Sequence, residues 1–194
     1  MESFLTGLGL SGSAGLNAYL PLLIIGLMVR LDLMEVQEPY DTLASWPVLL
    51  VLILLLLIEM TADKIPAVDS LNDGINTLIR PTAGAVLMAA STSSVESTDP
   101  TAITIFSLLS GSIFAGSTHA VKAAARPAVT VTTGGTGNFI VSFIEDVISF
   151  FVSLFAILLP FIVIFFAMSM VTIVSWWVWD RKRTRRYFQP NNPY

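Results

Sequence analysis

Runs of apolar residues, separated by short polar segments, follow one another along almost the whole chain. Several of them approach the roughly 20 residues that an α-helix needs to cross a bilayer. The last run, residues 139–179, would form about 60 Å of helix at about 1.5 Å per residue, so we expect it to turn near Pro160 and cross twice. The pattern predicts about six transmembrane helices, at residues 5–30, 46–62, 77–95, 102–125 and two within 139–179.

The composition supports an all-α polytopic helical membrane protein. Hydrophobic residues make up 54% of the 194 residues, and charged residues make up 12%, about half the share of a typical soluble domain. We expect one transmembrane domain at residues 1–180, surrounded by the lipid bilayer, and a basic tail at residues 181–194. The chain has no cysteine and one histidine, which excludes disulfides, thiolate catalysis and multi-histidine metal sites. We expect no metal, no cofactor and no nucleic-acid partner.

The charged residues are strongly segregated. The tail is basic from Arg181 to Arg186, whereas residues 32–41 and 96–99 are acidic. Because basic segments stay on the cytoplasmic side, six spans place both termini in the cytoplasm and both acidic segments outside. We therefore expect a multi-pass protein of the inner (plasma) membrane. Glu2 takes the place of a basic signal-peptide start, so the first helix is expected to stay in the mature protein.

A faint internal repeat accompanies this pattern. The letters LSGS at residues 10–13 recur at residues 109–112, close to half the chain length later. Three spans in each half would give inverted repeats at residues 5–95 and 102–179, the plan of many transporters; chance is the alternative, since these residue types are abundant. Small or helix-breaking residues are expected to mark helix packing or a solute pathway, namely Gly12, Gly15, Asn17, Pro21 and Gly116.

Four segments together resemble a known family. They are GLNAYLP at 15–21, ADKIPAVD at 62–69 with a later Arg80-Pro81, HAVK at 119–122 and SFIED at 142–146. In combination they resemble domain-of-unknown-function family 4126, a family of small bacterial membrane proteins, from about residue 9 to residue 160. The resemblance implies a multi-pass membrane protein and supplies no activity.

Acidic residues gather at and after the end of the second span, at Glu59, Asp63, Asp69 and Asp73. Glu59 and Asp63 are four residues apart and share one face if the helix continues that far. Charges cost several kcal/mol in hydrocarbon unless they are paired, solvated or functional. In the functional interpretation, these carboxylates at the membrane edge bind a cation or relay protons. The alternative is a solvated helix end that faces the cytoplasm.

Basic residues form a second group, because spacings of three and four place His119, Lys122 and Arg126 on one helical face. In the functional interpretation, this row of basic side chains binds an anionic solute or neutralises the acidic group. We expect Glu59 or Asp63 to pair with Lys122 or Arg126. The alternative is positive-inside anchoring, with His119 as a hydrogen-bonded packing residue.

Glu145 and Asp146 form a third group. Adjacent helical residues point about 100° apart, so we expect one of them to face the bundle.

The leading hypothesis is a small transporter or channel for a small polar or ionic solute, without catalytic residues. Its binding residues would be Glu59, Asp63, Asp69, Asp73, His119, Lys122, Glu145 and Asp146. The second hypothesis is a non-catalytic membrane scaffold or assembly partner, in which the charges hold the bundle together. A remote third is an intramembrane serine protease, because Gly9-Leu10-Ser11-Gly12 with a later histidine matches its nucleophile motif. A homodimer is compatible with the transporter, since six short helices barely enclose a pathway.

Overall fold

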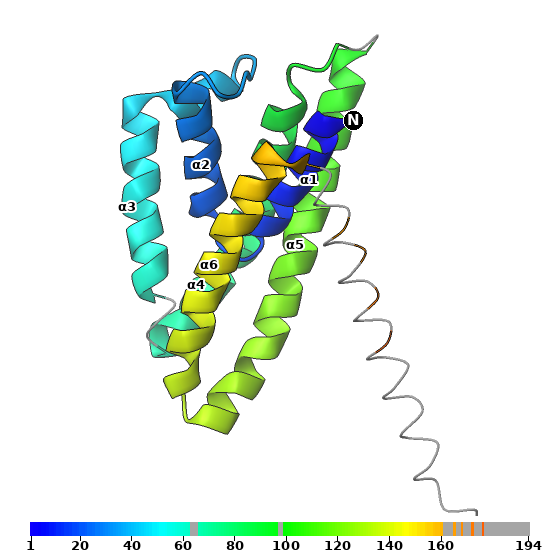
Figure 1. The fold of residues 1–194 in the computed structure, drawn as a ribbon. Helices are drawn as coiled ribbons and strands as arrows, with labels where there is room; N and C mark the ends of the chain where they lie inside the picture. The colour runs from blue at the N-terminus through cyan, green and yellow to red at the C-terminus, as the bar shows by residue number, and fades with distance from the viewer. Residues whose placement is uncertain are drawn as a thin grey trace, which may run out of the picture.

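The computed structural model describes residues 1–62, 66–96 and 99–160 with four later residues, and it leaves out the side chains of residues 66–71 and 73. The described chain is all-helical, which confirms the expected fold class (Figure 1). Its helices are α1 (Glu2–Ala14), α2 (Tyr19–Arg30), the 3₁₀ helix η1 (Tyr40–Ala44), α3 (Trp46–Ala62), α4 (Pro66–Thr92), α5 (Pro100–Thr133) and α6 (Thr136–Leu158). By length and composition, α5 and α6 are able to cross a membrane, and α2 and α3 are shorter apolar helices.

The predicted first span, residues 5–30, is not one helix. It breaks at Gly15–Ala18 into α1 and α2, which have 13 and 12 residues and are each about 20 Å long. The two helices run in opposite directions, so both outer ends lie at the same end of the bundle (Figure 1). One cleft there is bordered by Glu2 at the start of α1, by Leu33 after α2, and by the ends of α4 and α6. We call α1 and α2 together the hairpin, and Gly15–Ala18 its tip.

The hairpin changes the position of the N-terminus relative to the acidic segment 32–41. The sequence prediction put Met1 and the acidic segment 32–41 on opposite sides of the membrane. In the structure both lie at one end of the bundle, which we call the loop end (Figure 1). From there α3 to α6 run alternately between the loop end and the opposite end, which we call the turn end and which contains Gly134 and Gly135 (Figure 1).

Apolar side chains cover the outside of the bundle. Leu50 of α3, Ile113 of α5 and Phe143 of α6 are all more than half exposed. The inside, by contrast, holds many polar side chains, among them Thr6, Ser13, Asn17, Glu59, Asn76, Arg80, His119, Lys122, Arg126, Asn138, Ser142, Asp146, Ser149 and Ser153. An apolar exterior around a polar interior is favourable in lipid, whereas in water it would leave a large hydrophobic surface unpaired. The distribution therefore supports a membrane protein.

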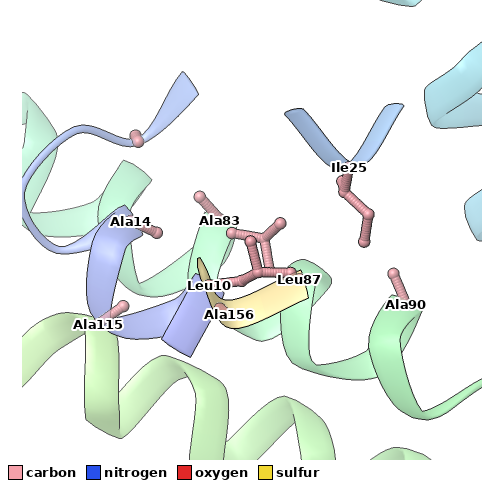
Figure 2. Packing of buried hydrophobic residues seen from close by; sticks show 9 residues of the cluster. Leu10, Ala14, Ile25, Ala83, Leu87, Ala90, Ala115 and Ala156 are labelled. Atoms are coloured by element: carbon pink, nitrogen blue, oxygen red, sulfur yellow. The ribbon is translucent and has the colours of Figure 1, made fainter. Parts of the chain in front are cut away.

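Small residues let the central helices approach closely. The buried apolar cluster consists of Leu10, Ile25, Leu87 and six alanines (Figure 2). Where α4 crosses α5, a Cβ atom added to Gly84 would lie 2.6 Å from the carbonyl oxygen of Gly111. This separation has no room for a methyl group, so the glycines set the distance between the two helices.

The bounds of α4 and α5 differ from the predicted spans, whereas α6 ends near the predicted break. Residues 66–76 lie outside the predicted spans, and a short helix was expected after Pro66; they belong instead to the long helix α4. This helix starts at Pro66, a residue that suits the first helical position. The helix α5 continues past its predicted end at residue 125 to Thr133, where Gly134 and Gly135 have φ values of 60° and 89° and turn the chain into α6. The helix α6 ends at Leu158, next to the predicted break, and residues 161–164 and 177–194, including the basic tail, lie outside the described residues.

The two LSGS segments are both helical, but they lie at different positions in their helices. Residues 10–13 end α1 just before the tip, whereas residues 109–112 lie in the middle of α5. The described residues give no support for the inverted repeat.

Candidate functional site at the hairpin tip

The tip leaves helix ends inside the bundle. The α1 helix ends at Ala14 and is followed by the carbonyl groups of Gly15 and Leu16, and α2 begins with N–H groups that have no partner within the helix. Asn17 satisfies two of these donors, since its Oδ1 accepts from the backbone nitrogens of Tyr19 at 3.2 Å and Leu20 at 3.0 Å. Pro21 lies in the first turn of α2, where a missing N–H costs nothing.

Gly15 is required at the tip by its surroundings. A Cβ atom at this position would lie 2.5 Å from the carbonyl oxygen of Ala115 in α5. Among the other predicted packing residues, Gly12 faces the ring of Phe114 at 2.9 Å from the added Cβ, and Gly116 has ordinary space beside Pro81 at 3.5 Å.

A buried ion pair joins α3 and α4 beside the tip. Arg80 Nη2 lies 3.0 Å from Glu59 Oε1, and the two side chains are 0% and 2% exposed. Glu59 Oε2 accepts from the backbone nitrogen of Ala18 at 3.2 Å, and its Oε1 accepts from Asn76 Nδ2 at 3.2 Å. Arg80 Nη1 donates to the carbonyl oxygen of Gly15 at 3.2 Å. The Arg80 guanidinium therefore binds the end of α1, and the Glu59 carboxylate binds the start of α2. The negative end of the α1 dipole and the positive end of the α2 dipole favour this arrangement.

The same arginine sets the protonation of His119. Arg80 Nη1 lies 2.9 Å from His119 Nδ1, and Nε2 of this histidine lies 3.3 Å from Thr77 Oγ1. A guanidinium group donates and never accepts, so Nδ1 is the acceptor and the proton of the neutral ring is on Nε2. His119 is thus a neutral ring that accepts from Arg80 in the structure.

Lys122 and Arg126 of α5 form a second ionic group with Glu145 of α6. Glu145 Oε2 lies 3.0 Å from Lys122 Nζ and 2.6 Å from Arg126 Nη2. Lys122 Nζ also donates to the carbonyl oxygen of Leu16 at 3.0 Å, so a second cation binds the end of α1. Glu59 binds Arg80, a pairing that was not predicted, and the predicted pairing with Lys122 or Arg126 stays a prediction for Glu59; the Asp63 alternative lies outside the described residues.

Asp146 reaches the tip from α6. Its Oδ1 accepts from Asn17 Nδ2 at 2.9 Å, and the residue is 7% exposed. Glu145 and Asp146 thus both have partners within the bundle, one on α5 and one at the tip, although a single inward residue was expected. Asn17 joins them as a residue with two roles, because it caps α2 and binds a carboxylate.

The structure brings together five of the eight predicted binding residues, at or near the tip: Glu59, His119, Lys122, Glu145 and Asp146. Asp63 lies outside the described residues, as do the side chains of Asp69 and Asp73 in α4. The central position of Arg80 was missed, because the sequence indicated this residue only as part of the family resemblance. Its location inside the predicted span at residues 77–95, with Pro81 following, was the available signal.

The residues of the protease motif are arranged for packing. Ser11 Oγ is fully buried and donates to the carbonyl oxygen of Gly84 at 2.8 Å. His119 binds Arg80 and Thr77, and no hydrogen bond joins Ser11 to His119 among the described residues. The geometry of a serine nucleophile with its base is therefore not the one observed there.

One comparison with known proteins gives a match. A family model with the description "Domain of unknown function (DUF4126)" matches residues 4–180, which confirms the expected resemblance over nearly the whole chain. No curated protein and no solved structure matches the chain.

Proposed function

The chain belongs to the DUF4126 family, and we propose that it is a multi-pass membrane transporter or channel for a small ionic solute, which binds at the hairpin tip. The observation that carries this proposal is the broken hairpin, whose helix ends meet Glu59, Arg80 and Lys122 inside the bundle. Irregular backbone at membrane depth is tolerated where protein buries it or where it lines a water-filled cavity, and transporter sites are commonly built at such interrupted helices.

The dimensions of the hairpin agree with this proposal. A helix of 12 or 13 residues covers about 20 Å, which is less than the roughly 30 Å of a hydrocarbon core. The hairpin would enter the membrane from the loop end and return to it, so that its tip lies within the hydrocarbon region. A charged solute would meet there both a negative helix end and a positive one.

The charge distribution suggests an orientation. The loop end has seven acidic residues and one basic residue among those described: Glu2, Asp32, Glu35, Glu38, Asp41, Glu96, Asp99 and Arg30. The basic residues Lys122 and Arg126 lie in the second half of α5, toward the turn end. By the positive-inside tendency, the turn end faces the cytoplasm and the N-terminus faces outward. We propose the inner (plasma) membrane as the location of the protein.

A solute would bind by replacing partners that the tip already has. A cation competes with Lys122 for the carbonyl oxygen of Leu16, at a position where Glu145 supplies negative charge. An anion competes with Glu59 for Arg80 and for the backbone nitrogen of Ala18. When a solute ion replaces a protein group as the partner of a buried charge, that charge stays paired throughout. This is required because an unpaired buried charge is costly.

Flux measurements with purified protein test the proposal. Liposomes that contain the protein should take up at least one tracer among sodium, potassium and chloride faster than liposomes without protein. Lys122→Met should abolish that uptake, whereas Ser107→Ala, at a buried hydroxyl between α4 and α5, should leave it unchanged. If folded wild-type protein passes none of the three tracers in either direction of the gradient, this function is wrong.

The second candidate function is a membrane scaffold. It is favoured by the ion pairs themselves, because Glu59, Arg80, Lys122 and Glu145 all bind protein groups at 3.0 Å. In that case the network stabilises the tip, and a second copy or another membrane protein packs on the apolar exterior. Loss of folding in Lys122→Met, without tracer uptake by the wild type, would favour the scaffold.

A further inference from the structure

We propose that the interface between α1 and α6 is a proton pathway, which connects the cleft at the loop end with Asp146 at the hairpin tip. The inference rests on the proposed function, because a proton delivered to the tip serves a protein that moves a solute there. In this proposal, the proton is the ion that moves together with that solute.

Three serine hydroxyl groups form the middle of this pathway. Ser13 Oγ of α1 lies 2.7 Å from both Ser149 Oγ and Ser153 Oγ of α6, and all three residues are fully buried. Ser153 Oγ also donates to the carbonyl oxygen of Ser149 at 2.8 Å. Each hydroxyl carries one proton and can accept another hydrogen bond, so the order of donors along the chain can reverse while the heavy atoms stay in place. Such a chain can accept a proton at one end and release another at its other end.

Both helices continue this chain to the tip. Ser149 follows Asp146 by three residues in α6, and Ser13 precedes Asn17 by four residues, so one helical turn of about 5 Å separates the hydroxyl groups from the Asn17–Asp146 pair. The hydrogen bond between Asn17 Nδ2 and Asp146 Oδ1 holds the carboxylate in the interface. A proton that arrives there converts the Asp146 carboxylate to the neutral acid, and its release restores the carboxylate.

The other end of the chain points to the cleft. This cleft has a volume of about 450 Å³, and its lining includes Thr6 together with the carboxylate residues Glu2 and Glu35. Thr6 Oγ1 donates to the carbonyl oxygen of Ala156 in α6 at 2.9 Å, so the same interface reaches the cleft. Seven residues of α1, about 10 Å, separate Thr6 from Ser13, and water from the cleft would bridge this distance in the proposed pathway.

A separate observation points to water beside Asp146. Ser142 lies one turn before Asp146 in α6, is fully buried, and its Oγ has no hydrogen-bond partner among the described residues. Buried hydroxyl groups are normally satisfied by protein or by ordered water. Ser142 therefore marks a position where water would complete the chain at the tip.

Charged groups on α3, α4, α5 and α6 lie at or near the tip together with Asp146. On α6 its neighbour Glu145 binds Lys122 and Arg126 of α5. On α3 and α4, Glu59 and Arg80 bind each other, and His119 of α5 accepts a hydrogen bond from Arg80. Glu145 offsets one of the two cations that it binds, and the Asp146 carboxylate supplies a second negative charge at the tip. Protonation of Asp146 therefore changes the charge of the centre by one unit, and a solute ion can compensate for this change.

The competing explanation is that the serines serve only in packing, since small hydroxyl residues let membrane helices approach.

Proton entry separates the two explanations. Liposomes that contain an internal pH-sensitive dye receive a defined membrane potential from potassium and valinomycin, and the rate of acidification is recorded. We expect Ser13→Ala to slow proton entry at least tenfold and Asp146→Asn to reduce it to the rate of protein-free liposomes.

Ser107→Ala is the matched control. Ser107 Oγ lies 2.8 Å from Thr92 Oγ1 at the interface of α4 and α5, so this substitution also removes a buried hydroxyl group that bonds to a hydroxyl of another helix. It should lower the thermal unfolding midpoint about as much as Ser13→Ala while proton entry stays within twofold of wild type. Ser153→Ala provides a second test of the chain if Ser13→Ala does not fold.

Equal proton entry in the Ser13→Ala or Ser153→Ala variant and in the Ser107→Ala variant would overturn the pathway. Sodium, potassium and chloride tracers in the same vesicles separate this failure from that of the proposed function. Tracer uptake with unaffected proton entry in the serine variants means that only the pathway is wrong. Proton entry that depends on Ser13, without tracer uptake, supports the pathway and contradicts the solute transport.

Discussion

Separating Glu59 from Arg80 should destabilise the protein far more than removing both. Glu59→Gln leaves the guanidinium of a fully buried Arg80 without its carboxylate at 3.0 Å. Arg80→Met leaves a buried carboxylate and removes the donor to the carbonyl oxygen of Gly15. Breaking a buried ion pair costs about 3–5 kcal/mol, and an orphaned buried backbone group adds about 1–3 kcal/mol. Each single substitution would thus consume a large part of a typical stability of about 5–15 kcal/mol.

The double variant Glu59→Gln/Arg80→Met has no unpaired charge at this position. We expect its loss in free energy of unfolding to be smaller than the sum of the single losses by at least about 2 kcal/mol. Reversible unfolding in mixed micelles, with increasing sodium dodecyl sulfate, measures the four proteins of the cycle. A double variant that folds when a single variant does not would show the same coupling. Losses that add to within about 0.5 kcal/mol would refute the reasoning, because they would mean that the two side chains do not interact.

Two further predictions concern packing and topology. Gly84→Ala should cost about 1–3 kcal/mol of unfolding free energy, because its methyl group would meet the backbone of α5. Gly116→Ala, with Pro81 at 3.5 Å from the added Cβ, should be neutral or slightly stabilising. Equal effects of the two substitutions on thermal unfolding would contradict the packing of α4 on α5. Single cysteines at Glu2 and Glu38 should both react with a membrane-impermeant reagent from outside intact cells, and one at Gly134 should not, in a chain that has no native cysteine. A reaction at only one of the positions Glu2 and Glu38 would mean that the hairpin crosses the membrane.

The helices that face outward were the part of the fold most open to prediction from sequence. The second span was predicted at residues 46–62, and α3 has these bounds because twelve consecutive apolar residues mark a lipid-facing helix. The hairpin was missed, because hydropathy records how apolar a segment is and not which way the chain runs. Gly15, Asn17 and Pro21 did mark the break, but a helix break looks the same in a sequence whether the chain continues across the membrane or turns back.

The candidate site could be predicted as a set of residues but not as a set of pairs. Buried carboxylates and cations stand out in an apolar chain, which is why Glu59, Lys122 and Asp146 were found. Their partners depend on where the tip lies, since Lys122 binds the carbonyl group of Leu16, which is available as an acceptor because α1 ends just before it. Arg80 was not assigned to the site, because the bond that defines its role is to a carboxylate 21 residues away on another helix.

The most direct test of the account is solute flux through the double variant Glu59→Gln/Arg80→Met. This protein should fold, because it leaves no unpaired charge, yet it lacks the ion pair that binds both helix ends at the tip. Uptake of sodium, potassium and chloride tracers is compared in liposomes with equal amounts of folded wild type and variant. The account predicts that the wild type passes at least one tracer and that the variant passes less than about a tenth as much, a difference of about 1.4 kcal/mol or more in the barrier. Equal uptake by the two proteins would contradict a solute site at the hairpin tip.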